Sequence, residues 1–368
     1  MKVIVIAAID AGSQMAHAIN TIKMAGGFHS CGHQVILITR KPLQKKNDVD
    51  LHDFYGIPSD ILWIQVPNFL GEHLLFAIAT LPFVLKYSPN LAYARNYACP
   101  WLFTKFDINT VGESHAHPSN NSRWFKKFIK SSHKCSFKAL ITINEVLSES
   151  YIEKGASDKK LYVLPDAVDP KLFGRPDLLP PSPYRSPKKI ATYTGHLYDY
   201  KGIPTILEAA KELPDIEFHL VGGLPEDIDR QKKRISDMKL TNVYLDGLKP
   251  HKEVPNYLWY ADILLLPPSA NHPSAQWTSP VKAGEYLLSG TPVIATSIPA
   301  LKRWFTDKEV EFINPDEPHE MATTIRCLLS DKKRTKELTE NGIKWALENT
   351  YAKRAEKIVE YALDQMSS

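Results

Sequence analysis

The chain has 368 residues, of which 43% are hydrophobic and 23% are charged, and its formal net charge is +4 at pH 7. This length and composition are typical of a soluble globular protein with two domains, each large enough for its own core. The small positive charge does not indicate a nucleic-acid-binding protein. The 4 cysteines are scattered without paired spacing, which argues against a disulfide framework and a zinc site and fits reduced thiols in the cytoplasm.

The first half of the chain alternates short apolar runs with helical segments. Residues 3–8 form a continuous apolar run, as in a strand that is covered on both faces, and a turn with Gly12 and Ser13 follows. A helical segment then leads to a second apolar run at 35–39. Strand, glycine turn, helix and strand make a Rossmann-like unit, although the GxGxxG pattern of dinucleotide-binding proteins is missing.

Neither apolar segment of the first half indicates membrane insertion. The run that begins at Met1 is short and leads directly into a polar turn, unlike a signal peptide. The longest apolar stretch, 73–85, is interrupted by Pro82 and is too short to span a bilayer. We therefore expect a cytoplasmic protein, with the inner face of the membrane as the alternative location.

Polar side chains occur at the end of a predicted strand at 108–114. Glu113 and His115 lie at its carboxyl end, and His117 follows two residues later. In parallel sheets this is the edge where ligands bind, and histidine can donate or accept a hydrogen bond near neutral pH. Glu113 and His115 are thus candidate site residues, with His117 second, and a loop histidine without a role is the alternative.

Residues 123–134 combine aromatic and basic side chains and contain no acidic residue. On a helix, Trp124, Phe125, Phe128 and Ile129 would share one face. One interpretation is a helix that docks on an anionic membrane surface. The other, which we favour, is a helix that packs its aromatic face on its own sheet, with the lysines in water. No nucleic-acid-binding motif surrounds the segment.

Seven prolines between residues 165 and 187 predict the boundary between two domains. We place the first domain at 1–170, a linker at 171–187 and the second domain at 188–345. The remaining segment, 346–368, is predicted to contain a helix that packs on the first domain.

Glycines follow several predicted strands of the second half. The strand at 189–195 ends in a glycine, and a lysine-glycine pair soon opens the next helix. The strand at 217–221 is followed by a double glycine, which lets the backbone approach a ligand closely, and a further strand is predicted at 243–248. The candidate ligand-binding residues of these turns are Gly195, Lys201, Gly222 and Gly223.

A loop, a helix and a strand are predicted at 279–296. Ser279 and Pro280 open the helix, which carries Lys282 and Glu285 on its first turns. The amide groups at the start of such a helix face the carboxyl edge of the preceding strand, where a phosphate would be favoured. Lys282 adds a full positive charge there, and Glu285 can accept hydrogen bonds from hydroxyl groups.

The pattern Ser-Pro-x-Lys-x-x-Glu-Tyr at 279–286 resembles the donor-site signature of the family 4 retaining glycosyltransferases, which have the GT-B fold. The resemblance implies that Glu285 holds the ribose of a nucleotide sugar. Trp277 stands where the usual signature has a second glutamate. Lys201 matches the lysine of the family's Gly-Arg…Lys-Gly loop, which neutralises the leaving diphosphate, and His196 replaces the arginine. The family counterpart of the strand at 243–248 borders the nucleobase, which makes Gly247 and Leu248 further candidates.

The resemblance extends to the first half of the chain. It implies that the turn with Gly12 and Ser13 lies near the donor phosphates, and that His115 faces a cleft between the domains. The implied architecture is an α/β GT-B fold, in which two Rossmann-like domains face each other across that cleft and a C-terminal helix crosses back to the first domain.

The implied reaction transfers a sugar, with retention of configuration, from a UDP- or GDP-linked donor to a hydroxyl of a saccharide, a lipid-linked glycan or a small molecule. No pair of catalytic carboxylates is evident, so a double displacement is not predicted. We expect a front-face route without an obligatory metal or cofactor. The alternatives are a nucleotide-sugar epimerase or hydrolase, and a non-catalytic, membrane-associated sugar-binding protein.

Overall fold

The structure, a computed structural model, describes the whole chain apart from five short stretches. The described residues are 1–42, 50–68, 73–118, 122–279 and 281–367. They form two compact units. The first unit consists of Met1–Ala167 together with Thr350–Ser368, and the second is Val168–Asn349.

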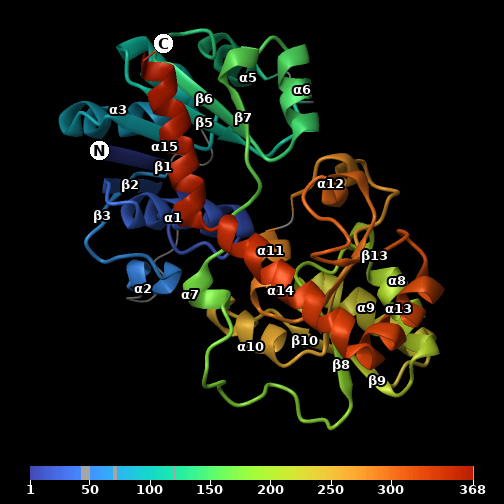
Figure 1. The fold of residues 1–368 in the computed structure, drawn as a ribbon. Coiled ribbons are helices and arrows are strands. Elements are labelled where there is room, and N and C mark those ends of the chain that lie inside the picture. The colour runs from blue at the N-terminus through green and yellow to red at the C-terminus, as the bar shows by residue number, and fades with distance from the viewer. Residues whose placement is uncertain (43–49, 69–72, 119–121, 280, 368) are drawn as a thin grey trace. The chain divides into compact units, whose positions relative to one another are not determined.

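A seven-stranded parallel sheet forms the centre of the first unit, with the strand order β3-β2-β1-β4-β5-β6-β7 (Figure 1). Most of these strands are buried on both faces, which explains why their sequences are continuous apolar runs. The strands are β1 (Lys2–Asp10), β2 (Gln34–Arg40), β3 (Leu62–Val66), β4 (Leu91–Ala94), β5 (Thr110–Ser114), β6 (Phe137–Thr142) and β7 (Leu161–Val163).

Helices cover both faces of this sheet. Helices α1 and α15 pack on the face that contains Val3 and Val5, whereas α3 and α4 pack on the face that contains Ile4 and Ile6. The described helices of the unit are α1 (Ala16–Ser30), α2 (Leu51–Tyr55), α3 (His73–Tyr87), α4 (Ala98–Phe103), η1 (Thr104–Phe106), α5 (Arg123–Ser131), α6 (Glu145–Glu153), η2 (Asp158–Lys160) and α15 (Tyr351–Ser367).

The C-terminal helix α15 lies very close to α1. A Cβ atom added to Gly27 would lie 2.4 Å from the carbonyl oxygen of Tyr351, so only glycine permits this approach. The last segment of the chain is therefore an integral part of the first unit's core.

Helix α5 packs its aromatic face on its own unit. Phe125, Phe128 and Ile129 are buried in a cluster that includes Phe137 and Tyr151. The favoured interpretation of the basic and aromatic segment is confirmed for these three side chains.

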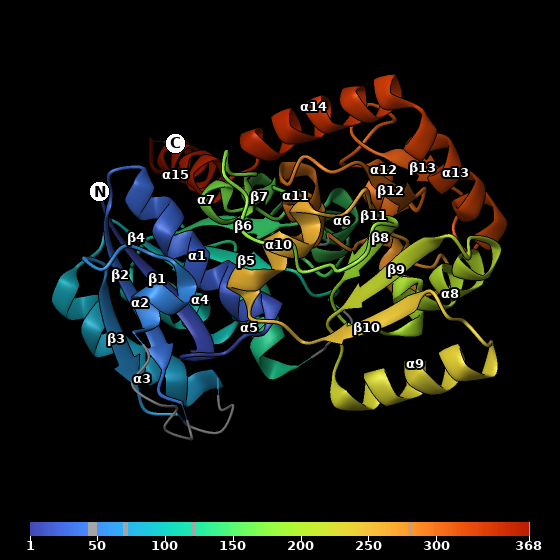
Figure 2. The ribbon, with the colours of Figure 1, turned by 90° about the horizontal axis from the view of Figure 1, so that it is seen from below.

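A six-stranded parallel sheet forms the centre of the second unit, in the order β10-β9-β8-β11-β12-β13. In Figure 2 its strands lie between α9 and α14. The strands are β8 (Lys189–Thr194), β9 (Ile216–Val221), β10 (Val243–Gly247), β11 (Ile263–Leu266), β12 (Val293–Thr296) and β13 (Glu311–Ile313). The described helices are α7 (Pro170–Phe173), η3 (Asp199–Lys201), α8 (Ile203–Glu212), α9 (Pro225–Asp237), η4 (His251–Glu253), α10 (Val254–Trp259), η5 (Pro273–Gln276), α11 (Val281–Leu288), α12 (Pro299–Lys302), α13 (Pro318–Ser330) and α14 (Lys332–Glu348).

Residues 171–187, which we expected to be a linker, lie within the second unit. Phe173 and Tyr184 are buried there, and the Tyr184 hydroxyl is 2.8 Å from both Thr192 Oγ1 and the carbonyl oxygen of Tyr257. Prolines signal irregular backbone, but they do not show whether that backbone is covered by side chains.

The boundary near the C-terminus also differs from the expected 346–368. Helix α14 ends at Glu348 in the second unit, and the first unit resumes at Thr350. In the described part of the chain, no helix combines the length and the apolar character that crossing a bilayer requires.

Candidate active site

Three glycine turns form the carboxyl edge of β8, β9 and β10. The amide of Gly195 donates to the carbonyl of Val221, and the amide of Gly222 donates to that of Gly247, both at 2.8 Å. Gly195 and Gly222 have φ angles of +122° and +124°. A Cβ atom on Gly222 would lie 2.4 Å from the Gly195 oxygen, so side chains are excluded here and backbone atoms line this edge.

Lys201 and Lys282 line one recess of the second unit. Lys201 ends the short helix η3 after β8, and Lys282 lies in the first turn of α11. The Lys282 ammonium donates to the carbonyl oxygen of Thr194 at 2.7 Å and lies 3.7 Å from the centroid of the Tyr193 ring. The recess is lined by Tyr193, Lys201, Leu266, Pro267, Pro268, Thr278 and Lys282.

Burial makes both ammonium groups easier to deprotonate. It lowers the pKa of Lys201. Burial, followed by the charge of Lys201, lowers the pKa of Lys282 well below its ordinary value, and Glu285 acts in the opposite direction. Two cations that share a partly dehydrated recess are suited to an anion with two negative charges, which would raise both pKa values again.

Replacing Lys282 by methionine should stabilise the free protein at neutral pH. Because burial lowers the pKa of Lys282 below 10.5, the unfolded chain binds this proton more tightly than the folded chain does. The free energy of unfolding of the wild type should therefore rise with pH up to 10.5, and this rise should be smaller in Lys282→Met.

Thermal unfolding at about pH 7 and about pH 10 would test this expectation. Lys302→Met, at an exposed position on α12, is the matched control and should leave the difference between the two pH values unchanged. A Lys282→Met protein that is less stable than the wild type at both pH values would contradict the lowered pKa of Lys282.

Glu285 lies on α11 and is 9% exposed. Its Oε1 atom is 3.2 Å from Nε2 of His251, whose ring makes an edge contact with the Phe173 ring at 5.2 Å. Sequence reasoning missed His251. The residue follows shortly after the strand at 243–248, so the rule that ligands bind at the carboxyl edge could have pointed to it.

The other candidate residues of the second unit lie in the turns after β8, β9 and β10 or close to the start of α11. The carbonyl oxygen of His196 accepts from the Tyr193 hydroxyl at 2.7 Å, and the His196 ring stacks on Tyr198. Ser279 lies two residues before the start of α11, whereas Leu248 is 66% exposed. Pro280 lies outside the described residues. Gly223 follows Gly222 in the turn after β9 and has a φ angle of +87°.

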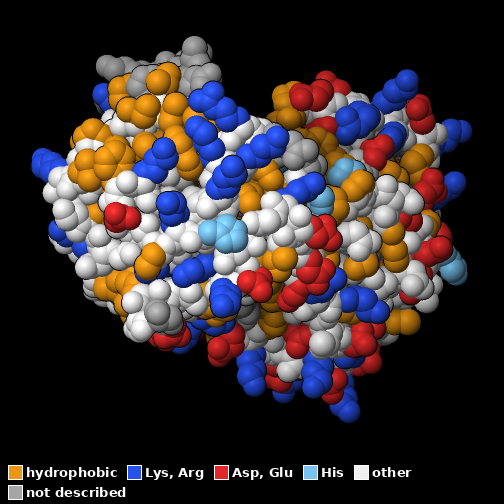
Figure 3. Space-filling view, turned by 90° about the horizontal axis from the view of Figure 1, so that it is seen from above, with side chains coloured by type: hydrophobic (Ala, Val, Ile, Leu, Met, Phe, Trp, Pro, Cys, Tyr) orange, Lys and Arg blue, Asp and Glu red, His pale blue; other side chains and the backbone are white. Residues whose placement is uncertain are grey.

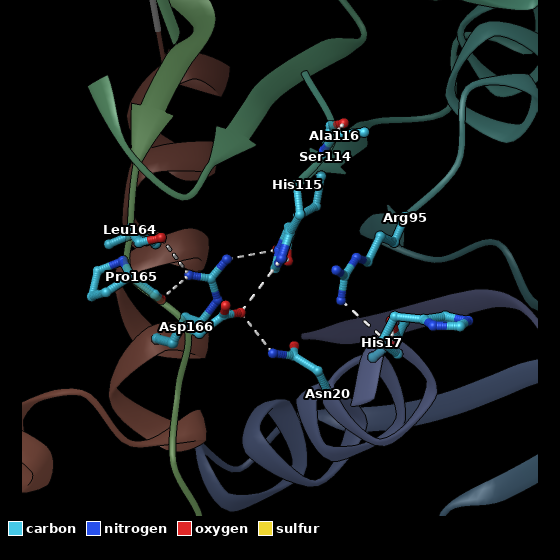
Figure 4. Close-up of polar contacts among 12 residues, drawn as sticks. His17, Asn20, Arg95, Ser114, His115, Ala116, Leu164, Pro165 and Asp166 are labelled. Atoms are coloured by element: carbon cyan, nitrogen blue, oxygen red, sulfur yellow. Dashed lines mark hydrogen bonds and ion pairs between the residues drawn. The ribbon is translucent and has the colours of Figure 1, made fainter. Parts of the chain in front are cut away.

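A buried polar cluster lies at the carboxyl end of β5 in the first unit (Figure 4). Glu113 is 2% exposed and contacts three side chains. Its Oε1 is 2.5 Å from His115 Nε2, its Oε2 is 2.9 Å from Arg354 Nη2, and the Tyr93 hydroxyl donates to Oε2. The structure thus brings the predicted pair Glu113 and His115 together and adds Arg354 from α15.

The cluster continues from His115 to the segment after β7. His115 Nδ1 is 3.5 Å from Asp166 Oδ1, which also accepts from the Asn20 amide at 2.7 Å. Arg354 Nη1 donates to two backbone carbonyl oxygens, those of Leu164 at 3.0 Å and Pro165 at 2.6 Å. Asn20, Asp166 and Arg354 were missed, because they are far apart in the sequence and no local motif marks them.

The surroundings lower the pKa of both Glu113 and His115. Burial opposes ionisation of Glu113, but Arg354 and then His115 outweigh it and hold the pKa of that carboxyl well below its ordinary value. Burial and the charge of Arg95 lower the pKa of His115, although Asp166 and Glu113 act against them. At neutral pH this arrangement favours a neutral imidazole beside a carboxylate.

The remaining candidates of the first unit lie at other positions. Gly12 has a φ angle of +84°, and the carbonyl oxygen of Ser13 accepts from the Tyr55 hydroxyl at 2.7 Å. Nε2 of His117 is 3.4 Å from the Ser150 hydroxyl, outside the cluster around Glu113. Of the two candidate histidines, His115 is therefore the one that the buried cluster holds.

Comparison with known proteins points to one family. Residues 175–345 match the family described as glycosyl transferases group 1. A segment of 113 residues is 32% identical to TuaH of Bacillus subtilis (strain 168), which is named as a teichuronic acid biosynthesis glycosyltransferase. This segment spans 31% of the chain and 28% of TuaH.

Solved structures resemble the chain over nearly its whole length. Anabaena HepE in complex with UDP has a TM-score of 0.73 and 15% identity, covering 99% of this chain and 100% of that one. A glycosyltransferase from Rickettsia africae has a TM-score of 0.75 and 18% identity, covering 99% and 98%. At such identities the likeness establishes the fold, and the predicted α/β architecture with two Rossmann-like domains of the GT-B type is confirmed.

Proposed function

We propose that the protein transfers a sugar from a nucleotide diphosphate sugar to an acceptor hydroxyl, because residues 175–345 match the family described as glycosyl transferases group 1. The observation that carries the proposal is the pairing of Lys201 and Lys282 in one recess, next to the glycine turn after β8. Such a site suits a diphosphate.

We assign the ribose of the donor to Glu285. Its carboxylate lies three residues after Lys282 on the same helix, and its low exposure would strengthen hydrogen bonds to hydroxyl groups. His251 holds Oε1 of this carboxylate and would orient it. A UDP-linked sugar is the first donor to test, because HepE has been solved with UDP and with UDP-glucose.

We propose that Glu113 and His115 serve the sugar or the acceptor. Glu113 fixes one nitrogen of the imidazole, and the lowered pKa of His115 keeps the ring able to accept a proton at neutral pH. Asp166 near the other nitrogen would further restrain the ring.

The proposed mechanism retains the anomeric configuration by a front-face route. As the bond between the sugar and the diphosphate breaks, negative charge develops on the leaving oxygen. Lys201, Lys282 and the amide groups at the start of α11 would stabilise that charge. Because these groups already supply positive charge, we propose that no metal is obligatory. The leaving diphosphate would then accept the proton of the attacking hydroxyl.

Glu285→Ala should lower turnover with the preferred donor at least about tenfold, which corresponds to about 1.4 kcal/mol of transition-state stabilisation. The donor is first identified by thermal shift with UDP-, GDP- and ADP-linked sugars, and products are then measured by mass spectrometry. Glu208→Ala, at an exposed position on α8, is the matched control and should keep full activity. Full activity of Glu285→Ala would overturn the assignment of the ribose.

The same assays separate the two alternatives. Net conversion of the donor without any acceptor would favour an epimerase or a hydrolase over a transferase. A protein that shows no thermal shift with any nucleotide sugar would instead favour a non-catalytic sugar-binding protein.

A further inference from the structure

Helix α3 exposes an apolar face. Leu75, Ile78 and Leu85 are 44%, 49% and 48% exposed, and Pro82 between them is exposed as well. These positions fall on one side of the helix, because residues separated by three or seven positions lie above one another. The residues that anchor the opposite side in the core are Phe76, Ala77 and Val84. A helix that is apolar on both sides marks an interaction surface.

Basic and aromatic side chains border this face. Helix α3 packs against α4, and α4 packs against α5. Across the second contact the rings of Trp101 and Trp124 lie 5.5 Å apart. The Lys127 ammonium lies 4.1 Å from the centroid of the Trp101 ring and 4.8 Å from that of Trp124, and Lys105 lies 4.6 Å from Trp101.

The border carries positive charge with little compensation. Helix α5 contributes Arg123, Lys126, Lys127 and Lys130 and has no acidic residue. Figure 3 looks onto the end of the first unit that carries α3 and α5, and its left half shows hydrophobic side chains gathered next to a band of Lys and Arg side chains. We call the exposed face of α3 and this border the α3–α5 surface.

We propose that the α3–α5 surface binds a bilayer that contains anionic lipids. A bilayer offers acyl chains to Leu75, Ile78 and Leu85 and negative headgroups to the lysines, while tryptophan and lysine are suited to the interface between the two. A second copy of the chain is a poorer occupant, since it would bring a second cationic border to the first. Phe125, Phe128 and Ile129 of α5 are buried and take no part in this contact.

Co-sedimentation with vesicles of phosphatidylglycerol and phosphatidylcholine tests the proposal. The wild-type protein should bind these vesicles and should bind phosphatidylcholine vesicles much more weakly. Lys126→Glu/Lys130→Glu should lower binding at least about tenfold and weaken its dependence on salt, because each basic residue near an anionic surface contributes about 1 kcal/mol, or roughly fivefold. Leu75→Glu/Ile78→Glu should lower binding about tenfold at every salt concentration.

Matched changes elsewhere separate local contact from general effects. Lys332→Glu/Lys333→Glu removes the same charge from exposed positions of α14, and Leu347→Glu alters a leucine that is 48% exposed on that helix. Both controls should bind vesicles as the wild type does. The proposal is overturned if the wild type binds no anionic vesicles, if the α14 variants lose as much binding as the α3–α5 variants, or if light scattering shows a dimer that Leu75→Glu/Ile78→Glu dissociates.

Discussion

Lys201→Ala is expected to lower turnover about a hundredfold while the protein stays folded. The removal of one preorganised group that stabilises a developing negative charge commonly costs a factor of this size, about 2.7 kcal/mol. The effect should appear mainly in kcat, because the charge on the leaving diphosphate grows in the transition state. The recess would keep Lys282, so binding of the ground-state donor should weaken less.

Two measurements separate the effect on catalysis from the effect on donor binding. Steady-state kinetics separate kcat from KM, and calorimetry with the nucleoside diphosphate measures ground-state binding. Lys211→Ala, which removes an exposed lysine from the end of α8, is the matched control and should behave as the wild type. A Lys201→Ala enzyme with unchanged kcat would show that the recess does not hold the leaving group.

Arg354→Met is expected to destabilise the first unit by about 3–5 kcal/mol. Arg354 is 3% exposed and lies 2.9 Å from the carboxylate of Glu113, which is 2% exposed. Without the guanidinium, a buried carboxylate loses its nearest positive charge, and the two carbonyl groups after β7 lose a donor. Urea unfolding followed by tryptophan fluorescence and circular dichroism would measure the loss.

A second substitution and a change of pH test the cause of that loss. Glu113→Gln combined with Arg354→Met should recover part of the stability, because no unpaired charge is then buried. The lowered pKa of Glu113 contributes stability above the ordinary value of 4.5, and this contribution is lost as the pH falls below it. The double variant should therefore lose less stability than the wild type upon acidification.

The surface pair of Arg326 and Asp215 provides the contrast. Its guanidinium makes two hydrogen bonds of 2.5 and 2.6 Å to the carboxylate, yet the two side chains are 50% and 58% exposed. Arg326→Met should leave the urea midpoint nearly unchanged, because water screens an exposed pair. Equal losses in Arg326→Met and Arg354→Met would show that burial of Glu113 is not the reason.

Much of the fold could be predicted from short sequence patterns. The apolar runs that became β1, β6 and β11 are continuous because helices or loops cover both faces of each sheet. The turns at Gly195 and Gly222 could also be predicted, because a turn with positive φ at the end of a strand favours glycine. By contrast, the prolines of 171–187 suggested a linker, whereas this segment lies within the second unit and its Tyr184 is buried.

Local sequence patterns predicted two α/β units, glycine turns at strand ends, and a lysine and a glutamate on the first turns of one helix, because backbone geometry and helix periodicity act over a few residues. Three features could be seen only in the folded chain: Arg354 pairs with Glu113, His251 contacts Glu285, and α3 exposes an apolar side to solvent. These contacts join residues distant along the chain. Their partners are chosen by packing and by the cost of leaving a buried charge alone, and neither leaves a mark in a local pattern.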